Sequence, residues 1–348
     1  MKLIVHAVNI HVGGGKSLLL ALLNALPADI PVLITLDVRL ELPAILPANL
    51  CIIRVAPTIG ARFAAEKKLT QLAQAGDLVL CFGNLPPWFK LAGHVLTFVQ
   101  NRYLIDTVSL KSFSWKTRLR LLCERLWLAC KANNVDEFLV QTPSMQRVFN
   151  ASGRARGRQI HVLPFSNISQ GYCRNFNTLL PKSPLPTFIY VASGEPHKNH
   201  RNLVAAWCLL AQEGIFPSLK LTLAQSANQK LCRWLDHQIK SFQLKVENLG
   251  MLSHADVQGQ YAKAQALIFP SVFESFGLPL IEARQAGLAV LASELDYVRD
   301  VVDPEEAFDP ASPISIAQAV KRFLGLANAP LPLLDARAFL TTIVQLNK

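Results

Sequence analysis

Short apolar runs alternate with helix-forming stretches along the whole of this chain, and this rhythm limits the folds open to it. The runs cover residues 2–8, 32–36, 51–55, 78–81, 95–99 and 138–140 in the first half, and residues 187–191, 220–224, 246–249, 266–269 and 289–292 in the second. Buried strands that take turns with helices are typical of parallel sheets covered by helices. The sequence therefore predicts an α/β fold.

The length of the chain and one break in this rhythm indicate two domains. A chain of 348 residues is too long for one ordinary domain and comfortable for two. Residues 166–186 are rich in Asn, Ser and Pro and show little periodicity. We expect a linker at residues 171–186, which leaves an N-terminal domain over residues 1–170 and a C-terminal domain over residues 187–332.

Basic charge is concentrated in the first of these domains. Residues 1–170 hold 19 Lys or Arg against 9 Asp or Glu, whereas the rest of the chain holds 16 against 15. We therefore expect an anionic partner for the first half alone. Nucleic acid is the weaker candidate, because no nucleic-acid motif or array of stacking aromatic residues accompanies the charge. An anionic membrane surface is the stronger one.

Cysteine usage and hydropathy indicate a cytoplasmic protein. The seven cysteines are widely spread and lack the paired spacing of a metal or redox site, so they are interpreted as reduced core residues. The longest apolar stretch, residues 18–26, is well short of the roughly 20 residues that span a bilayer. We expect no transmembrane helix, and a location in the cytoplasm or peripherally on the inner face of the cytoplasmic membrane.

Two glutamates eight positions apart give the strongest chemical signal. Glu274 and Glu282 lie in the segment 269–283, which follows an apolar run and passes through a loop with Gly and Pro into a helix. Ligands of parallel sheets bind at this carboxyl edge. Loop N–H groups and a helix N-terminus attract phosphate, and carboxylates accept hydrogen bonds from hydroxyl groups. Phosphate combined with a polyol indicates a nucleotide sugar.

Three further motifs occur in the order found in a known family. They are Gly-Glu-Pro-His-Lys-Asn at 194–199, Leu-Gly-Met-Leu-Ser at 249–253 and Gly-Leu-Ala-Val-Leu-Ala-Ser at 287–293. With Glu274 and Glu282 they resemble the retaining glycosyltransferases of the large Glu-x7-Glu family, the glycosyl transferases group 1 of the family 4 type. The resemblance implies the GT-B fold, with two Rossmann-like domains facing across a cleft and a final helix, residues 333–348, packed back on the first domain.

The resemblance also implies roles in the donor site. Glu282 would bind the ribose hydroxyls, Glu274 would orient the transferred sugar, and Lys198 would neutralise the pyrophosphate leaving group, whose charge rises in the transition state. Relatives carry an arginine five or six residues before this lysine, where this chain has Ala192 and Ser193. Arg201 is a candidate substitute. The other donor-binding candidates in this half are Gly194, Asn199, Met251, Leu252, Ser275, Phe276, Gly277 and Leu278.

A glycine-rich loop follows the first apolar run and opens the first helix, a position suited to phosphate. A Walker A loop would need a glycine where the chain has Ile10, and the dinucleotide fingerprint fails at Leu18. The resemblance implies that this loop approaches the donor phosphate, while a tight turn capped by Ser17 is the structural alternative. The donor-binding candidates here are Gly13, Gly14, Gly15 and Lys16.

Polar residues that follow the apolar runs 78–81 and 95–99 are candidates for binding the acceptor substrate. They would lie at the same edge of the sheet as the glycine-rich loop. Many family members have a histidine near the end of one of these strands, where Gln100 or Asn101 stands here. We therefore name His11 as the candidate catalytic histidine, with His6 as the other histidine near the edge. The acceptor-side candidates are Asn84, Gln100, Asn101, Arg102 and Tyr103.

Residues 111–132 are predicted to form a helix with two different faces. One stripe at helical spacing, which we expect to pack on the domain core, consists of Trp115, Leu119, Leu122 and Leu126. The other side combines apolar and basic residues in a mixture suited to anionic lipid headgroups. It consists of Leu121, Trp127 and Leu128 beside Arg120, Arg125 and Lys131.

The resemblance as a whole implies an enzyme that moves a hexosyl group from a nucleotide sugar to a glycan or lipid-linked acceptor. It implies retention of configuration, no metal and no other cofactor, in the assembly of a surface polysaccharide such as O-antigen or capsule. Glu274 is expected to position the sugar and not to attack it. Two alternatives stay open: an inactive module that binds nucleotide sugars, and a related epimerase or phosphorylase.

Overall fold

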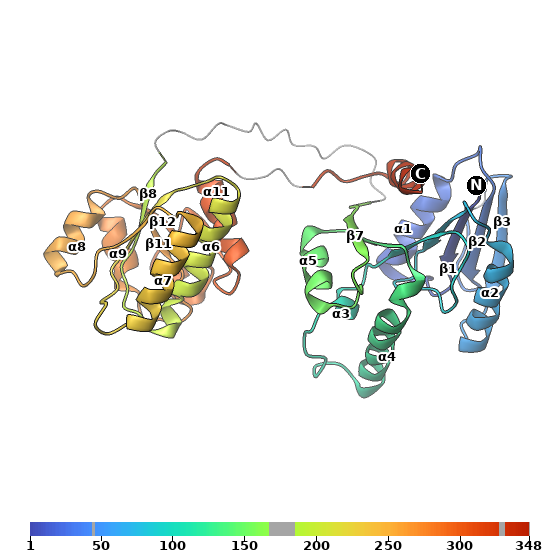
Figure 1. Ribbon diagram of the computed structural model, residues 1–348, viewed down its shortest axis with the longest axis horizontal. Coiled ribbons are helices and arrows are strands. Elements are labelled where there is room, and N and C mark those ends of the chain that lie inside the picture. The colour runs from blue at the N-terminus through green and yellow to red at the C-terminus, as the bar shows by residue number, and fades with distance from the viewer. Residues whose placement is uncertain (44–45, 167–184, 327–330, 348) are drawn as a thin grey trace. The chain divides into compact units, whose positions relative to one another are not determined.

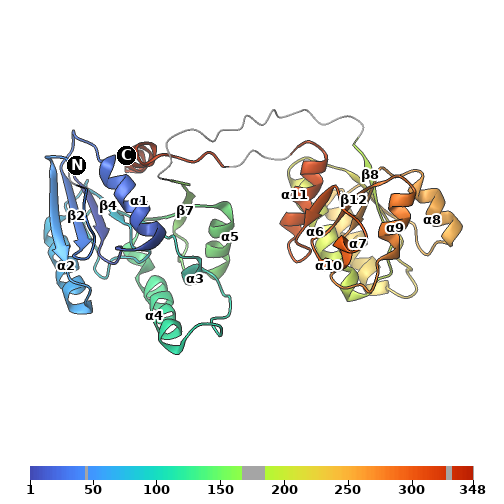
Figure 2. The same ribbon diagram turned by 180° about the vertical axis from the view of Figure 1, so that it is seen from behind.

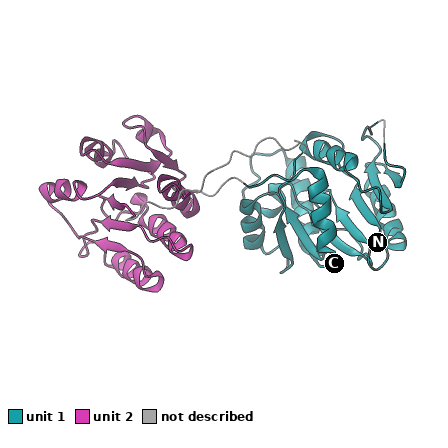
Figure 3. Cartoon of the chain, turned by 90° about the horizontal axis from the view of Figure 1, so that it is seen from above, with its two compact units in different colours: residues 1–174, 330–348 teal, residues 175–329 magenta. Residues whose placement is uncertain are grey.

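The computed structural model describes residues 1–43, 46–166, 185–326 and 331–347, which fall into two compact units (Figure 3). The first unit comprises residues 1–174 and 330–348, and the second comprises residues 175–329. Most of the predicted linker, residues 171–184, lies outside the described residues. Each unit is described by itself below.

Seven parallel strands form the sheet of the first unit, in the order β3-β2-β1-β4-β5-β6-β7 (Figure 1). The strands are β1 (Leu3–Ala7), β2 (Val32–Asp37), β3 (Leu50–Val55), β4 (Leu78–Cys81), β5 (His94–Phe98), β6 (Glu137–Val140) and β7 (Gln159–Val162). The helices are α1 (Gly13–Asn24), α2 (Ile59–Leu72), α3 (Arg102–Ile105), α4 (Trp115–Lys131), η1 (Ala132–Asn134), α5 (Pro143–Ser152) and α12 (Ala336–Leu346).

Six parallel strands form the sheet of the second unit, in the order β10-β9-β8-β11-β12-β13. They are β8 (Thr187–Tyr190), β9 (Ser218–Leu221), β10 (Val246–Asn248), β11 (Ala266–Phe269), β12 (Ala289–Ser293) and β13 (Glu306–Phe308). The helices are η2 (Pro196–Lys198), α6 (His200–Gln212), α7 (Gln229–Phe242), α8 (His254–Tyr261), α9 (Leu278–Gln285), α10 (Asp296–Arg299) and α11 (Pro313–Phe323).

Both sheets have the topology of Rossmann-like domains. The strand order reverses beside the first strand of each unit, between β1 and β4 and between β8 and β11. Right-handed crossovers on the two sides of such a reversal place helices on opposite faces of the sheet, and Figures 1 and 2 show helices on both faces. Strands covered on both faces are mainly apolar, as in the fully buried β1, β2 and β4, whose polar residues are His6, Thr35 and Asp37. The predicted pair of Rossmann-like α/β domains is confirmed.

The last helix of the chain belongs to the first unit. Phe339 of α12 stacks on Phe165, with ring centroids 4.7 Å apart, and also lies against Phe98 of β5. Leu334 exchanges backbone hydrogen bonds with the segment that follows β7. Helix α12 therefore completes the core beneath α1.

All eleven predicted strands occur, with ends shifted by a few residues at most. Two strands were not predicted, β7 and β13. Each is short, partly exposed and located at the edge of its sheet, so it lacks the continuous apolar run that marks a central strand. Within the described part of the chain, no helix combines the length and the apolar character that crossing a bilayer requires.

The prediction for the faces of α4 was wrong. Leu121 and Leu128, assigned to the lipid-facing side, are buried in the core. The stripe expected to pack on the core is exposed to solvent and consists of Trp115, Leu119, Leu122 and Leu126. Both faces of the helix carry large apolar residues, so spacing alone could not decide between them.

Polar partners on the inner side explain the orientation of α4. The Arg125 guanidinium donates to the carbonyl oxygens of Tyr103 and Val108, at 2.7 and 3.3 Å. The Trp127 indole N–H donates to the Pro86 carbonyl at 3.1 Å. Buried or half-buried polar groups need such partners, and the loops after β4 and β5 supply them on this side of the helix.

Candidate functional site

The two charged residues of the predicted donor site meet directly in the second unit. Lys198 ends η2, which follows β8, and Glu274 lies in the loop after β11. The Lys198 Nζ donates to the Glu274 Oε1 at 2.7 Å, and both side chains are largely buried, with exposed fractions of 18% and 13%. The pair therefore lies at the reversal of strand order, where parallel sheets bind ligands.

The loops that carry this pair are locked together by backbone groups. The Val272 N–H donates to the His197 carbonyl at 2.8 Å, and the hydroxyl of the buried Tyr190 donates to the Lys198 carbonyl at 2.8 Å. Burial raises the pKa of the Tyr190 hydroxyl, so this group stays a neutral donor. The position of Lys198 is thus fixed by the main chain on both sides.

Asn199 adds a second clamp from an unusual backbone position. Its φ of 61° lies in the left-handed region, which asparagine tolerates better than most residues. The side-chain amide donates to the carbonyl oxygens of Pro270 and Pro310, at 3.1 and 2.7 Å. A predicted donor-binding residue therefore connects the ends of three strands, β8, β11 and β13.

A helix N-terminus opens beside Glu274. Gly277 precedes α9 with a φ of 76° and no side-chain cap. Pro279 has no N–H and the Leu280 N–H donates to the Gly277 carbonyl at 2.9 Å, so the N–H groups of Gly277 and Leu278 are the ones left without a partner among the described residues. A Cβ at this position would lie 2.9 Å from the Leu280 side chain, which further restricts the position to glycine. Phe276 and Leu278 are exposed on the two sides of this turn. These residues and Ser275 thus surround a turn whose backbone suits an anion.

Glu282 lies one turn further along α9 and is oriented by a residue that the sequence did not indicate. The hydroxyl of Tyr261 donates to the Glu282 Oε2 at 3.2 Å. Burial raises the pKa of this tyrosine, and the nearby carboxylate raises it further. The Oε1 atom of Glu282 lies 4.0 Å from the His254 Nδ1. Tyr261 therefore fixes the carboxylate while leaving one oxygen for a ligand.

The predicted loop after β10 lies at the same edge of the sheet. Gly250 has a φ of 73°, and its N–H donates to the Asn248 side chain at 3.2 Å. Met251 is one of the most exposed apolar residues of the chain, at 86%. Leu252 packs partly against the core. The loop thus leaves the Met251 side chain exposed at this edge.

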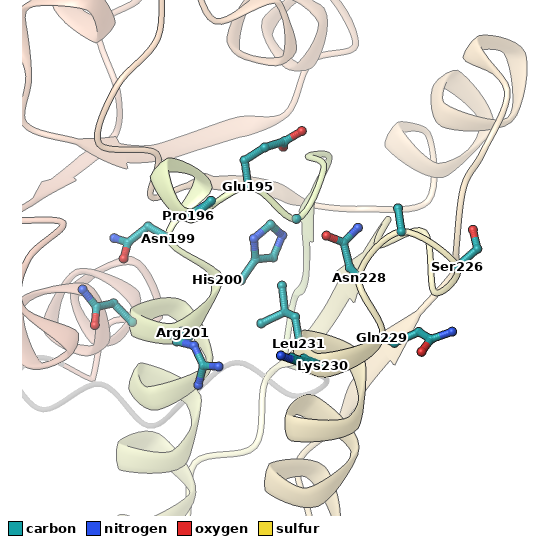
Figure 4. A pocket seen from close by; sticks show the side chains of 13 residues that line it. Glu195, Pro196, Asn199, His200, Arg201, Ser226, Asn228, Gln229, Lys230 and Leu231 are labelled. Carbon is teal, nitrogen blue, oxygen red and sulfur yellow. The ribbon is translucent and has the colours of Figure 1, made fainter.

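A hollow of about 700 Å³ lies beside these loops, between the N-termini of α6 and α7 (Figure 4). Gly194 and Asn199 line it. Arg201 lines it too, but its guanidinium stacks on Trp234 of α7 at 4.8 Å from the ring centroid. Arg201 is thus engaged elsewhere, and no contact between it and Lys198 or Glu274 occurs among the described residues.

His200 is a residue of this hollow that the sequence did not single out. It is buried, its ring packs on Tyr190 at 4.9 Å, and neither ring nitrogen has a hydrogen-bond partner among the described residues. Burial lowers its pKa to about 4. His200 is therefore neutral at pH 7.

In the first unit, the glycine loop forms the start of α1 as predicted from its position. The helix begins at Gly13, whose φ is 68°, and has no side-chain cap, so Ser17 lies inside the helix and does not cap it. A Cβ at Gly15 would lie 3.7 Å from the Gln100 Oε1, which places the loop beside an acceptor-side candidate. Gly14 has open space around its Cα, and Lys16 lies 3.9 Å from the exposed Glu41.

The acceptor-side candidates mainly hold one another in place. The Asn84 side chain accepts hydrogen bonds from the N–H groups of Gln100 and Asn101, at 2.7 and 2.9 Å. Asn101 caps α3, and Arg102 pairs with Asp106 at 2.8 Å within it. Tyr103 packs edge-on against Phe113. Asn84, Gln100 and Asn101 thus form one hydrogen-bonded cluster, whereas Arg102 and Tyr103 contact Asp106 and Phe113 in the adjacent segment.

His11, the candidate catalytic histidine, lies beside a buried carboxylate. Its Nδ1 is 3.9 Å from the Oδ2 of Asp37, which is fully buried at the end of β2. The guanidinium of Arg39 lowers the pKa of Asp37 by a bidentate contact at 2.7 and 2.8 Å. Asp37 could not be recognised from sequence, since neither a motif nor a charge pattern marks it.

An apolar hollow of about 590 Å³ lies at the same edge of the first sheet. Trp88, Trp127 and Phe63 line it, and its floor contains the buried ion pair of Arg62 and Glu66, at 2.8 Å. The Glu66 Oε1 also lies 3.4 Å from the Nε2 of His6. His6 therefore belongs to a buried polar network and is not exposed at the sheet edge. No group of three or more His, Cys, Asp or Glu residues suited to a metal occurs in the described ranges.

Comparison with known proteins bears on the second unit. Residues 174–331 match the family model described as glycosyl transferases group 1. The match spans the second unit from end to end. It covers Lys198, Glu274 and Glu282, so the contact between Lys198 and Glu274 lies within the matched region.

Two curated relatives are mannosyltransferases. The serotype-specific mannosyltransferase WbdA of Escherichia coli is 30% identical over 219 residues, which cover 58% of this chain and 27% of that protein. The O-antigen chain mannosyltransferase B of Escherichia coli is 28% identical over 114 residues, covering 33% and 30%. This chain thus spans about a quarter of the length of the WbdA proteins it matches.

Solved structures of low identity cover nearly the whole chain. Anabaena Alr3699/HepE in complex with UDP and glucose is 17% identical over 99% of this chain and 95% of that chain, with a TM-score of 0.35. A glycosyltransferase from Rickettsia africae is 14% identical over 99% and 93%, with a TM-score of 0.38. Because these TM-scores lie below 0.5, the fold assignment rests on the two sheets themselves.

Proposed function

We propose that this chain is a retaining glycosyltransferase that moves a mannosyl group from a nucleotide sugar to a glycan or lipid-linked acceptor in the assembly of an O-antigen-like polysaccharide. The observation that carries the proposal is the buried Lys198–Glu274 pair, 2.7 Å apart, next to the uncapped N-terminus of α9. The family match over residues 174–331 supports glycosyl transfer, and the Escherichia coli mannosyltransferases support mannose.

Each residue of the site has a distinct task in this proposal. The ribose hydroxyls bind the free oxygen of Glu282, which Tyr261 holds in place. The diphosphate lies at the N–H groups of Gly277 and Leu278 and beside Lys198. Glu274 shares its Oε1 with Lys198, while its Oε2 receives no hydrogen bond from a described residue and is available for a sugar hydroxyl.

The same arrangement accounts for bond cleavage. As the bond between the anomeric carbon and the phosphate oxygen breaks, negative charge grows on the nucleoside diphosphate, and Lys198 stabilises it. The acceptor hydroxyl attacks the anomeric carbon from the face the diphosphate leaves, and its proton passes to the departing phosphate oxygen. Products are the glycoside with unchanged anomeric configuration and the nucleoside diphosphate.

A panel of nucleotide sugars tests the proposal. The chain is incubated with GDP-, UDP- and ADP-linked mannose and glucose and a mannose-terminated acceptor, and released nucleoside diphosphate is measured. We expect release with a mannosyl donor, and an α-linked product by NMR. Glu274→Gln should abolish release, whereas Glu247→Gln, on an exposed residue of β10, should not.

The outcomes separate the alternatives. Donor binding without release from any sugar would identify an inactive binding module. Release with an inverted anomeric centre would refute retention, and formation of a free isomerised sugar or a sugar phosphate would identify an epimerase or phosphorylase. Turnover with glucose but not mannose would refute the sugar class alone.

A further inference from the structure

Four large apolar side chains form a solvent-exposed stripe along α4. Trp115, Leu119, Leu122 and Leu126 have exposed fractions of 69%, 54%, 49% and 65%. Their spacing of four, three and four residues places them on one side of the helix, opposite the buried Leu121 and Leu128. We call this surface the α4 stripe. Contiguous exposed apolar patches of this kind mark interaction surfaces.

Helix α4 lies at a free end of the first unit, far from α12, in both views of the ribbon (Figures 1 and 2). Its inner face is anchored by Arg125 and Trp127, as described above. Its outer face meets no other element of the first unit as far as the structure describes it. The α4 stripe is therefore a stable feature of a firmly attached helix and not the result of a loosely packed one.

Basic residues flank the α4 stripe. On a helical projection Lys116 and Arg120 lie on one side of it and Arg118 on the other, and all three are exposed. Residues 107–131 contain six Lys or Arg against one acidic residue, Glu124. Glu124 projects to the opposite side of the helix from Trp115, and burial raises its pKa. The outer surface is thus apolar at its centre and cationic at its margins.

The cations differ in whether the protein already uses them. Arg118 donates to the Lys111 carbonyl at 3.0 Å, Arg125 binds two carbonyls, and Lys131 lies over the Trp88 ring at 4.4 Å. Arg120 has only a 4.0 Å contact with Glu124. Lys116 lies 5.8 Å from the centroid of the Trp115 ring, at the stripe itself. Lys116 and Arg120 are therefore the cations best placed to meet a partner.

We propose that the α4 stripe docks on an anionic lipid bilayer, with its Trp and Leu side chains at the boundary between headgroups and acyl chains. Lys116 and Arg120 then lie at the level of the lipid phosphates. A helix with Trp and Leu on one face and Lys and Arg beside them has the composition of interfacial helices. The proposal does not depend on the identity of the sugar donor, because no residue of α4 is among the donor-site candidates.

Charge and chemistry favour lipid over the other occupants. A second copy of the chain would bring the same cationic margins against each other, which costs free energy. Nucleic acid would meet the cations, but three of the four side chains of the stripe are leucines, and Trp115 is its one aromatic ring on which a base could stack. An anionic bilayer satisfies both the apolar centre and the cationic margins.

Vesicle co-sedimentation with the full chain tests the apolar part. We expect binding to vesicles of phosphatidylcholine mixed with phosphatidylglycerol, weak binding to phosphatidylcholine alone, and loss of binding as salt rises. The double substitution Leu119→Ser, Leu126→Ser should weaken binding about 100-fold. The matched control is Leu331→Ser, Leu333→Ser, which removes two exposed leucines near α12 and should leave binding unchanged.

A second pair of variants tests the charged part. Lys116→Gln with Arg120→Gln should weaken binding about 30-fold, since each basic residue near the surface contributes about a fivefold factor. Lys67→Gln with Lys68→Gln removes the same charge from the exposed side of α2 and should change binding by less than about threefold. All four variants should unfold at the wild-type temperature, because every replaced side chain is exposed.

Three results would overturn the proposal. The first is wild-type protein that does not sediment with anionic vesicles. The second is a Leu119→Ser, Leu126→Ser variant that binds them like wild type. The third is a dimer in solution that this variant converts to a monomer, which would assign the α4 stripe to a second copy.

Discussion

Each unit has an asparagine in the left-handed conformation at the carboxyl edge of its sheet, and the two side chains act with opposite polarity. Asn84 in the first unit accepts two hydrogen bonds from backbone N–H groups of the loop after β5. Asn199 in the second donates two to backbone carbonyls after β11 and β13. The same residue type thus occupies backbone N–H donors at the edge of the first sheet and backbone carbonyl acceptors at the edge of the second.

This difference explains why the two edges suit different ligands. In the second unit Asn199 occupies the carbonyl oxygens of Pro270 and Pro310, while the N–H groups of Gly277 and Leu278 have no partner among the described residues, which favours an anion. In the first unit the N–H groups of Gln100 and Asn101 are already bonded, so the loop after β5 offers side chains and not backbone donors. The proposed function accordingly places the phosphate end of the donor at the second edge, and the uncapped start of α1 is the corresponding position in the first unit.

The largest effect should come from removing the cation of that edge. Lys198→Met should lower kcat about 1000-fold, or about 4 kcal/mol, with a smaller change in donor affinity, because leaving-group charge grows toward the transition state. The equivalent change in the first unit, Lys16→Met, should cost less than about tenfold, since this lysine is near the exposed Glu41. Steady-state kinetics and calorimetric donor titration measure both. An equal loss of kcat in the two variants would refute the placement of the leaving group at the edge of the second sheet alone.

Buried histidines provide the next contrast. His6 in the first unit has Thr35 at 2.6 Å and Glu66 at 3.4 Å, whereas His200 in the second has no partner among the described residues. Because the pKa of His200 falls to about 4 on folding, the unfolded state binds more protons between pH 4 and the unfolded value near 6.5. Stability of the second unit is therefore complete above that range and is lost as pH falls through it, by about 3 kcal/mol.

Denaturant unfolding at pH 4.5 and pH 7 measures this loss. His200→Phe, which keeps the ring packing on Tyr190, should remove most of the pH dependence of the second unit. His254→Phe, at an exposed position, is the control and should keep it. If wild type and His200→Phe lose the same free energy of unfolding between pH 7 and pH 4.5, His200 is not the source of the pH dependence.

The two asparagines can be tested by one exchange that reverses their polarity. Asn84→Asp keeps an oxygen acceptor for two N–H groups and should change stability by less than about 1 kcal/mol. Asn199→Asp removes a donor and places a carboxylate against two carbonyl oxygens, so it should destabilise the second unit by about 2–3 kcal/mol. Thermal unfolding followed in each variant distinguishes them. Equal costs would show that the left-handed backbone, and not hydrogen-bond polarity, decides both positions.

The smallest effect concerns ribose binding. Glu282→Ala should weaken donor binding about tenfold, equivalent to about 1.4 kcal/mol, with little change in kcat. Tyr261→Phe should weaken it by less, because the carboxylate remains and loses only the hydroxyl that orients it. Calorimetric titration with the donor found in the panel measures both. Unchanged affinity for Glu282→Ala would remove the ribose assignment.

Local sequence was enough to predict the sheets and the residues of the second edge. Lys198, Glu274 and Glu282 stand in motifs that follow strands, so their place at the edge could be inferred. Their partners could not, because the contacts of Lys198 with Glu274 and of Tyr261 with Glu282 join segments 76 and 21 residues apart. Such contacts depend on strand order, which periodicity does not encode.

The first unit was predicted less well for the same reason. Asp37, Glu66 and Arg62 are buried charged residues whose roles follow from their partners and not from any motif. The inner and outer faces of α4 were exchanged, because the carbonyl acceptors that fix the helix lie in loops before it. Composition was enough to identify the basic half of the chain, but which face of α4 is exposed to solvent depends on packing.

The return of α12 to the first unit has a consequence for how the chain is made. The aromatic stack of Phe98, Phe165 and Phe339 joins residues from both ends of the sequence. On the ribosome, Phe339 follows Phe165 by 174 residues, so at roughly 5–20 residues per second the first unit waits about 9–35 seconds for its last helix. The second unit is continuous in sequence and can finish first. The amino-terminal half is thus synthesised earlier but completed later.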